Sequence, residues 1–439
     1  MLPGMLVRFG TTADAGIPAS PPAIRPSEAT TSRSAVLDAV RLGQARSRLE
    51  IAQVTGLTRA VVAQRVGELI DRGLLSEGGT GPSTGGRPAR RLRFAHGSGM
   101  VLVADLGATS IDVALADLGG TIIAHHGEPA DVAAGPEIIL ARVEALFDEL
   151  LVGAGSTAPV WGIGIGVPGP VEFETGRPIA PPIMPGWDGY PVRERFAARF
   201  NVPVWVDNDV NVMALGEWRH GVARGHADVV FVKLGTGIGA GLISDGQLHR
   251  GAQGSAGDVG HIQVSDDPST VCRCGNIGCL EALTGGAALA RDATAAAREG
   301  RSPRLAEILA AAGSVGAADV AVAAAHGDPV SVELLQRAGR QIGSMLAGVV
   351  NFFNPSLIVI GGGVAQAGDL LLAAIRETVY ARSLPLATRD LLVQRSALGN
   401  LGGVTGAAAM VIDELFTPAR LSERLDDANS AFAPEAASA

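Results

Sequence analysis

Four side chains of the types that bind zinc lie close together in this sequence. Cys272, Cys274 and Cys279 are the only cysteines of the chain, and His261 stands eleven positions before the first of them. Three thiolates and one imidazole form a common tetrahedral zinc shell. Crowded thiols with no disulfide partner elsewhere favour a metal in a reducing compartment. Because this shell leaves no open coordination position, we expect a structural Zn²⁺, against the alternative that small cysteines merely fill a core.

A run of carboxylates and amides follows an apolar segment at residues 203–206. It reads Asp207-Asn208-Asp209 and lies at the end of an expected strand. Ligand chemistry in α/β folds usually occurs at the carboxyl ends of strands. Asp209 is therefore the candidate general base toward a hydroxyl group. The alternative is that Asp207 and Asn208 cap the helix that follows.

Glycine clusters follow three apolar strands. Strand–turn–strand units are predicted at residues 100–116 and 229–243, and a third cluster closes a buried strand at residues 358–363. Glycines let backbone N–H groups approach phosphate oxygens, although a glycine after a strand is often only a turn. The chain has no GxxxxGK(S/T) sequence, which excludes an ordinary P-loop. Two similar hairpins about 130 residues apart predict a duplicated α/β lobe.

The segment before these strands predicts a helix–turn–helix. Helical spacing covers residues 34–42. Ser47 and Glu50 fit a capping box for a short helix over residues 49–54, and Thr58 can cap the next helix after a glycine turn. An outward-facing second helix can enter a major groove, where Arg and Gln read base edges. Its expected buried residues are Val62, Val66 and Leu69, and its expected outward residues are Arg59, Ala60, Val61, Gln64 and Arg65.

Two strands and a basic charge extend this head. Residues 74–76 and 92–94 predict a winged hairpin, whose glycine-rich tip places Arg87 for a minor groove. Between Arg33 and Arg93 eleven arginines face five acidic residues, a balance of +6 in a chain whose total is −9. The combination predicts operator DNA as a partner. The alternatives are a solvated basic face or a helical dimerisation cap.

Length and composition bound the remaining possibilities. The chain has 439 residues, which predicts two or three domains, and 47% hydrophobic residues, ample for a large core. No apolar stretch is long enough for a membrane helix, and the first residues lack a signal-peptide core, so we expect a cytoplasmic protein with no membrane partner. Residues 1–32 are expected to form a disordered leader and 426–439 a flexible tail. Lys233 is the only lysine, which we attribute to genome composition.

Together these residues resemble the ROK family of bacterial sugar kinases and sugar-responsive repressors. The most specific part is Gly254-Ser255-Ala256-Gly257-Asp258-Val259-Gly260-His261, followed by the cysteine cluster and Glu281. The resemblance implies an α/β, actin-like (RNase H-like) body of two lobes at residues 99–425, divided near residue 209. The basic head at residues 33–95, a winged helix-turn-helix, resembles the repressor branch, because the kinases generally lack it.

The resemblance also implies roles for individual residues. Asp209 matches the catalytic base, Asn208 its sugar-binding neighbour, and His261 would use one ring nitrogen for zinc and the other for a hydroxyl. The remaining implied sugar-site residues are Gly169, Asp258 and Glu281, and those of the nucleotide-phosphate motifs are Gly107, Thr109, Thr236, Gly237 and Gly362.

Several positions depart from the kinase pattern. Ala108 adds a methyl group to the first phosphate turn, and Ser110 removes a cation from it. Asp258 replaces a glutamate and is one methylene shorter. Ile183 and Met184 stand before a Pro-Gly-Trp element where kinases tend to have an asparagine. Together these changes favour a body that keeps a sugar site and has a weakened ATP site.

The leading interpretation is therefore a sugar-responsive transcriptional repressor of carbohydrate metabolism. It would act as a homodimer or homotetramer, with a sugar or sugar phosphate as effector. The alternative is an ATP- and Mg²⁺-dependent sugar kinase of the hexokinase type, with Asp209 as base and an attached DNA-binding head. A third interpretation is a ligand-independent DNA-binding oligomer with a relic body.

Overall fold

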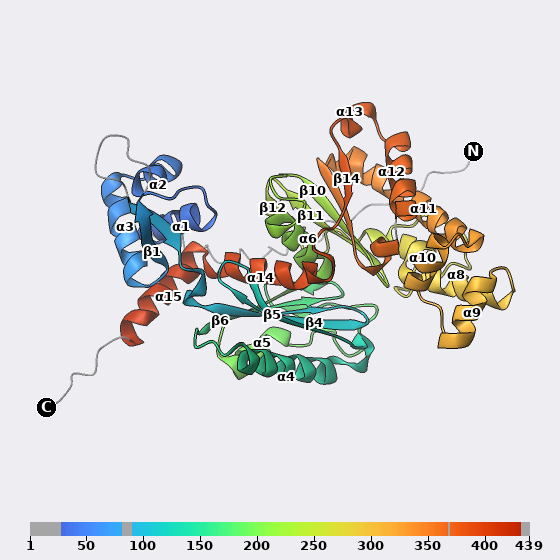
Figure 1. Ribbon diagram of the computed structural model, residues 1–439, viewed down its shortest axis with the longest axis horizontal. Coiled ribbons are helices and arrows are strands. Elements are labelled where there is room, and N and C mark those ends of the chain that lie inside the picture. Colours follow the sequence, from blue (N-terminus) through green and yellow to red (C-terminus); the bar gives the residue numbers. More distant parts are fainter. Residues whose placement is uncertain (1–27, 81–89, 368, 432–439) are drawn as a thin grey trace, which may run out of the picture.

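The structure, a computed structural model, describes residues 28–80, 90–367 and 369–431. Figure 1 shows a small N-terminal head at one end of a two-lobed body, with the last helix of the described chain lying against the head. Arg87 and the predicted wing tip fall outside the described residues, as do the expected leader up to residue 27 and the last eight residues.

The head has the predicted helix–turn–helix and hairpin. Ser47 accepts the N–H of Glu50, and Thr58 accepts that of Val61, so both predicted caps are confirmed. In a capping box the Glu50 carboxylate would accept the N–H of Ser47, whereas here it accepts the N–H of Arg46 at 2.6 Å. The elements of the head are α1 (Glu28–Arg41), α2 (Arg48–Thr55), α3 (Arg59–Asp71), β1 (Leu75–Thr80) and β2 (Arg90–Phe94).

Both ends of the described chain extend further into helix than we expected. The helix α1 begins at Glu28, inside the expected leader, and α15 (Pro418–Ala431) continues into the expected tail. The two helices pack against each other, and the hydroxyls of Thr30 and Ser422 lie 3.4 Å apart. Leu421 and Leu425 of α15 belong to the same buried core as Leu37 of α1, and the sequence does not show that such distant segments meet.

The first lobe of the body is a five-stranded sheet in the order β5-β4-β3-β6-β9. The strands β3, β6 and β9 are parallel, β4 is antiparallel to β3, and β5 is antiparallel to β4. A short hairpin of β7 (Val171–Glu172) and β8 (Arg177–Pro178) follows β6. The main strands are β3 (Met100–Leu106), β4 (Ser110–Asp117), β5 (Ile122–Pro129), β6 (Val160–Val167) and β9 (Val204–Asn208), with α4 (Pro136–Ala154) and α5 (Val192–Phe200) on one face.

The second lobe repeats this plan in the order β12-β11-β10-β13-β14. Its central pair β10 and β13 is parallel, and β10 and β11 form the predicted second hairpin. The strands are β10 (Val229–Leu234), β11 (Ile238–Ser244), β12 (Gln247–Leu248), β13 (Leu357–Gly361) and β14 (Leu392–Arg395). The helices of this lobe are α7 (Leu280–Thr284), α8 (Gly286–Arg298), α9 (Pro303–Ala312), α10 (Ala317–Ala325), α11 (Pro329–Phe353), α12 (Asp369–Arg382) and α13 (Pro385–Thr388).

Two helices fill the space between the sheets. They are α6 (Asp209–His220), which follows β9, and α14 (Gly402–Leu415), which returns from the second lobe. Along β3, Val101 and Val103 face this central layer, whereas Leu102 faces α4, as the period of two in a strand requires. The helices cross so closely that a Cβ on Gly406 would lie 1.5 Å from the Val212 carbonyl oxygen. The body therefore has five layers, α/β/α/β/α.

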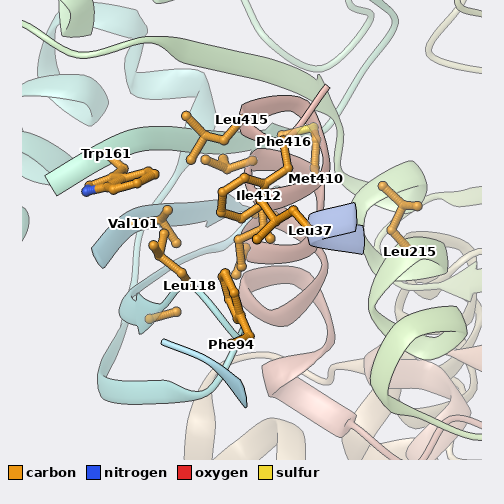
Figure 2. Close-up of a cluster of buried hydrophobic side chains, with 14 of the residues drawn as sticks. Leu37, Phe94, Val101, Leu118, Trp161, Leu215, Met410, Ile412, Leu415 and Phe416 are labelled. Atoms are coloured by element: carbon orange, nitrogen blue, oxygen red, sulfur yellow. The ribbon is translucent and has the colours of Figure 1, made fainter. Parts of the chain in front are cut away.

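The head shares its core with the body. Figure 2 shows Leu37 and Phe94 of the head beside Ile412 and Phe416 at the end of α14. The rings of Phe94 and Phe416 meet edge to face, with centroids 5.6 Å apart. The Ser34 hydroxyl donates to the Phe416 carbonyl at 2.7 Å. The head is thus held to the body by packing as well as by the chain connection.

Candidate functional site

A cleft of 1910 Å³ lies between the two lobes. Ordinary small-molecule sites occupy roughly 300–1,000 Å³, so this cleft has room for more than one ligand. The carboxyl ends of β3, β6, β9, β10 and β13 lead into it. Every sugar-site and phosphate-motif residue expected from the sequence lines it: Gly107, Thr109, Gly169, Asn208, Asp209, Thr236, Gly237, Asp258, His261, Glu281 and Gly362.

Asn208 and Asp209 lie where β9 passes into α6. Asn208 caps the helix, because its Oδ1 accepts the N–H groups of Val210 and Asn211, and its Nδ2 donates to the Gly169 carbonyl at 2.9 Å. Asn208 therefore does cap α6, as the alternative interpretation expected, and its amide also holds the loop of Gly169 at the cleft. Asp209 does not cap; its carboxylate is almost fully buried at the cleft wall.

The Asp209 carboxylate has a cationic partner that sequence reasoning missed. Its Oδ2 forms an ion pair with the Lys233 ammonium, which reaches across from β10 of the other lobe. Asp105 on β3 lies in the same acidic group, and burial, together with Asp209 and Asp112, raises its pKa to about 7. A lysine in the otherwise apolar run Val-Val-Phe-Val-Lys-Leu was the available signal.

Glu281 links the segment that holds the three cysteines to the second glycine turn. Its Oε2 accepts the N–H of Ile238 at 3.0 Å, at the start of β11. A Cβ on Gly237 would lie 2.3 Å from this oxygen, so a larger residue at that position would displace the Glu281 carboxylate. The carboxylate is held at the cleft by the backbone of the turn, with its second oxygen left for a ligand.

His261 and the three cysteines form a cluster whose dimensions suit zinc. All four ligand atoms lie within 4.8 Å of one another. The Cys274 and Cys279 sulfurs are 3.7 Å apart, and the Cys272 sulfur is 3.6 Å from Nδ1 of His261. Tetrahedral Zn–S bonds of about 2.3 Å and Zn–N bonds of about 2.0–2.1 Å imply separations of about 3.8 and 3.6 Å. The donor set therefore fits a closed metal centre.

The second nitrogen of His261 points away from the cysteines. Its Nε2 lies 3.8 Å from the carboxylate of Asp258, which is half exposed and lines the cleft. Cys279 directly precedes α7, the helix that holds Glu281. A metal bound here would thus fix two cleft residues at once, His261 directly and Glu281 through the start of α7.

A second ion pair connects the lobes near residues 254–261, the segment that carries the family resemblance. Arg250, just before that segment, donates to the buried Asp207 carboxylate of β9 at 2.7 Å. The same guanidinium lies 3.7 Å from the centroid of the Phe173 ring. We did not single out Arg250 in the sequence, because nothing local links it to Asp207.

The exposed face of α3 is narrower than we predicted. Arg59, Ala60 and Gln64 are exposed, but Arg65 turns back into the head. Its Nε donates to the Ser32 hydroxyl at 3.0 Å and its Nη1 to Glu68 at 2.6 Å. The outward orientation expected for Arg65 was wrong, because Glu68 one turn further along the helix attracts its guanidinium.

A carboxylate at the end of α14 connects the body to the head. Asp413 accepts from Arg219, near the end of α6, at 3.1 Å and from Arg41 of α1 at 3.1 Å. The helix α6 therefore has one end in the cleft, at Asp209, and the other at a junction with the head.

The model of the ROK family matches residues 101–414. The chain belongs to the ROK family. A xylose repressor from Caldicellulosiruptor bescii is 33% identical over 374 residues, 84% of this chain and 92% of that protein. The crystal structure of a ROK family transcriptional regulator, a homologue of the E. coli MLC protein, has a TM-score of 0.76 and 28% identity, covering 91% of this chain and 99% of that one.

A kinase structure matches less of the chain. The Streptomyces griseus ROK glucokinase, solved with glucose and AMPPNP, has a TM-score of 0.62 and 30% identity, covering 71% of this chain and 99% of that one. The ROK regulators extend over a larger share of this chain than the kinase does. The fold and the family expected from the sequence are confirmed. No helix in the described ranges is long and apolar enough to cross a bilayer.

Proposed function

We propose that this protein is a sugar-responsive transcriptional repressor. The observation that carries the proposal is a basic winged head that shares one hydrophobic core with a ROK body. Regulators of the family match both parts, whereas the glucokinase covers only 71% of the chain. In this proposal the head binds operator DNA in the cytoplasm and the cleft binds the effector.

The chemistry of the cleft supports a polyhydroxylated effector. Carboxylates of Asp209, Asp258 and Glu281 line the cleft and accept hydrogen bonds, which suits sugar hydroxyl donors. The glucokinase relative was solved with glucose, which places a sugar in a related body. A Zn²⁺ ion held by His261 and the cysteines would keep this wall in shape and supply no reaction step.

The junction at Asp413 gives the effector a route to the head. A sugar that closes the lobes would move the start of α6, which holds Asp209. The twelve-residue helix packs closely on α14 and meets Arg41 through Asp413. The head would then change its position relative to a second head on the operator. A tenfold change in operator affinity requires a coupling free energy of about 1.4 kcal/mol.

A second copy of the chain completes the proposed repressor. Phe352 at the end of α11 is 94% exposed, and Leu384 and Leu386 beside α13 are 68% and 77% exposed. The N–H of Leu384 donates to Asn351 of α11, so these apolar side chains belong to one surface. Exposed apolar patches of this kind mark association surfaces. Sedimentation velocity should give a homodimer or homotetramer, and Phe352→Ser should shift it toward monomer.

A sugar kinase is the second candidate, because Asp209 and all three glycine clusters line the cleft. One experiment separates the candidates: calorimetry with a panel of sugars, paired with a coupled assay for ATP-dependent phosphorylation. Sugar binding without turnover, together with sugar-dependent operator gel shifts, is the expected result. Turnover that Asp209→Asn abolishes would instead establish the kinase. Operator binding with no sugar binding would leave a DNA-binding oligomer with a relic body.

A further inference from the structure

Lys233 is the only lysine in the 439-residue chain, and it lies among carboxylates. Its side chain is 20% exposed and paired with Asp209. Burial alone lowers the pKa of a lysine, but Asp209, Asp105 and Asp112 outweigh it and raise the pKa of Lys233 above its ordinary value. The ammonium is therefore a permanent charge of the cleft at neutral pH.

The same carboxylates have the composition of a divalent-cation site. Asp105, Asp112 and Asp209 come from β3, β4 and the start of α6, and all three line the cleft. The Asp105 Oδ1 is buried with no hydrogen-bond partner. Magnesium and manganese prefer carboxylate oxygens, and phosphoryl transfer from ATP depends on such a cation. Here the Lys233 ammonium already supplies positive charge to this group.

Resting on the proposed function, we infer that Lys233 is a built-in cation that replaces a divalent metal and makes the cleft a receptor for an unphosphorylated sugar. Its ammonium binds Oδ2 of Asp209 and leaves Oδ1 to accept a sugar hydroxyl. With Oδ2 held by the ammonium, Asp209 has one carboxylate oxygen left, which recognises the hydroxyl as a hydrogen-bond acceptor. The group of three carboxylates and Lys233 therefore does not fit the magnesium of magnesium–ATP.

The other cations of the cleft are already paired. Arg250 is bound to Asp207, and Arg395 to Asp369. The cleft also carries the acidic groups of Asp258 and Glu281. These carboxylates would repel a phosphate dianion, because the nearest ammonium, that of Lys233, is already paired with Asp209. Neutral hydroxyls would instead donate hydrogen bonds to the carboxylates.

The test compares the wild type with Lys233→Met, which removes the charge at similar length, and Lys233→Arg, which keeps it. Manganese binding to the zinc-loaded proteins is followed by electron paramagnetic resonance. We expect at least tenfold tighter Mn²⁺ binding in Lys233→Met than in the wild type or Lys233→Arg. Equal binding in all three proteins would overturn the inference. Lys233→Gln serves the same purpose if circular dichroism shows that Lys233→Met does not fold.

Two further measurements use the single lysine. Because Lys233 carries the only side-chain amine, peptide mass spectrometry can follow the rate at which that amine is acetylated. A bound sugar should lower this rate at least tenfold. Calorimetry should give at least tenfold weaker binding for the 6-phosphate of the same sugar, and tighter binding of the phosphate would overturn the inference. If no sugar binds at all, the proposed function fails, while the Mn²⁺ comparison still decides the role of Lys233.

Discussion

At the residue scale, two arginines of one helix separate DNA contact from head stability. Arg59 is exposed at the start of α3, whereas Arg65 binds Ser32 and Glu68. We expect Arg59→Ala to weaken operator binding by about tenfold, since a lost contact costs about 1–3 kcal/mol, and to leave the melting temperature unchanged. Fluorescence anisotropy with labelled operator measures the first effect and thermal unfolding the second.

Arg65→Ala is the matched variant for that prediction. This variant should lower the melting temperature of the head, because Glu68 loses the guanidinium of Arg65 as a partner. It should reduce operator affinity only to the extent that the head is destabilised. If both variants weaken binding equally at unchanged stability, the assignment of the outward face is wrong.

The buried carboxyl of Asp105 predicts a pH-dependent stability. Burial raises its pKa from 3.8 to about 7, so the folded protein keeps a proton there that the unfolded chain releases. The contribution of this group to the free energy of unfolding therefore falls as the pH rises between those values, and is constant above them. Thermal unfolding of Asp105→Asn, which mimics the protonated form, should decline less than the wild type between about pH 5 and pH 7. Parallel curves would contradict this.

At the element scale, the loop with the three cysteines would position two cleft residues once it binds a metal. Cys274→Ser should remove zinc, and with it lower sugar affinity by at least tenfold, because His261 and the start of α7 lose their common anchor. Atomic absorption and calorimetry measure the two effects. The exposed neighbour Arg273→Ala is the control and should change neither. Full sugar affinity in zinc-free protein would show that the metal is unconnected to the ligand site.

The elements that sequence reasoning predicted are those with local signals. The caps Ser47 and Thr58, the apolar strands with their glycine turns and the cysteine spacing each encode their structure within a few residues. What it missed depends on partners distant in the chain: Lys233 meets Asp209 across the lobes, and α1 meets α15. Arg65 is the exception, since its partner Glu68 is only three residues away and the electrostatic attraction between them was readable.

At the scale of the whole molecule, one carboxylate joins α6, which begins in the cleft, to the head. Asp413 binds Arg41 of the head and Arg219 of α6. Asp413→Asn should keep sugar affinity within about twofold and reduce the effect of sugar on operator affinity toward none, because the charge that joins the helices is lost. Operator titrations with and without sugar give the coupling.

Asp426→Asn is the control for this coupling. Asp426 forms an ion pair with Arg33 where α15 meets the head, but the Asp426 side chain is 65% exposed and the pair does not involve α6. It should leave the sugar response intact. If Asp413→Asn responds to sugar as fully as the wild type, the signal travels by another route.

The shared core of head and body has a consequence for biosynthesis. Ser34 binds the Phe416 carbonyl, 382 residues later in the chain, and α14 fills a layer between the sheets. The head emerges from the ribosome before the body, and its packing partner at the end of α14 follows only after the two lobes have been translated. Contacts between such distant segments form slowly. Chains that end before α14 would therefore carry a head without its packing partner. Only chains that include α14 could then bind the operator in a way that the effector regulates.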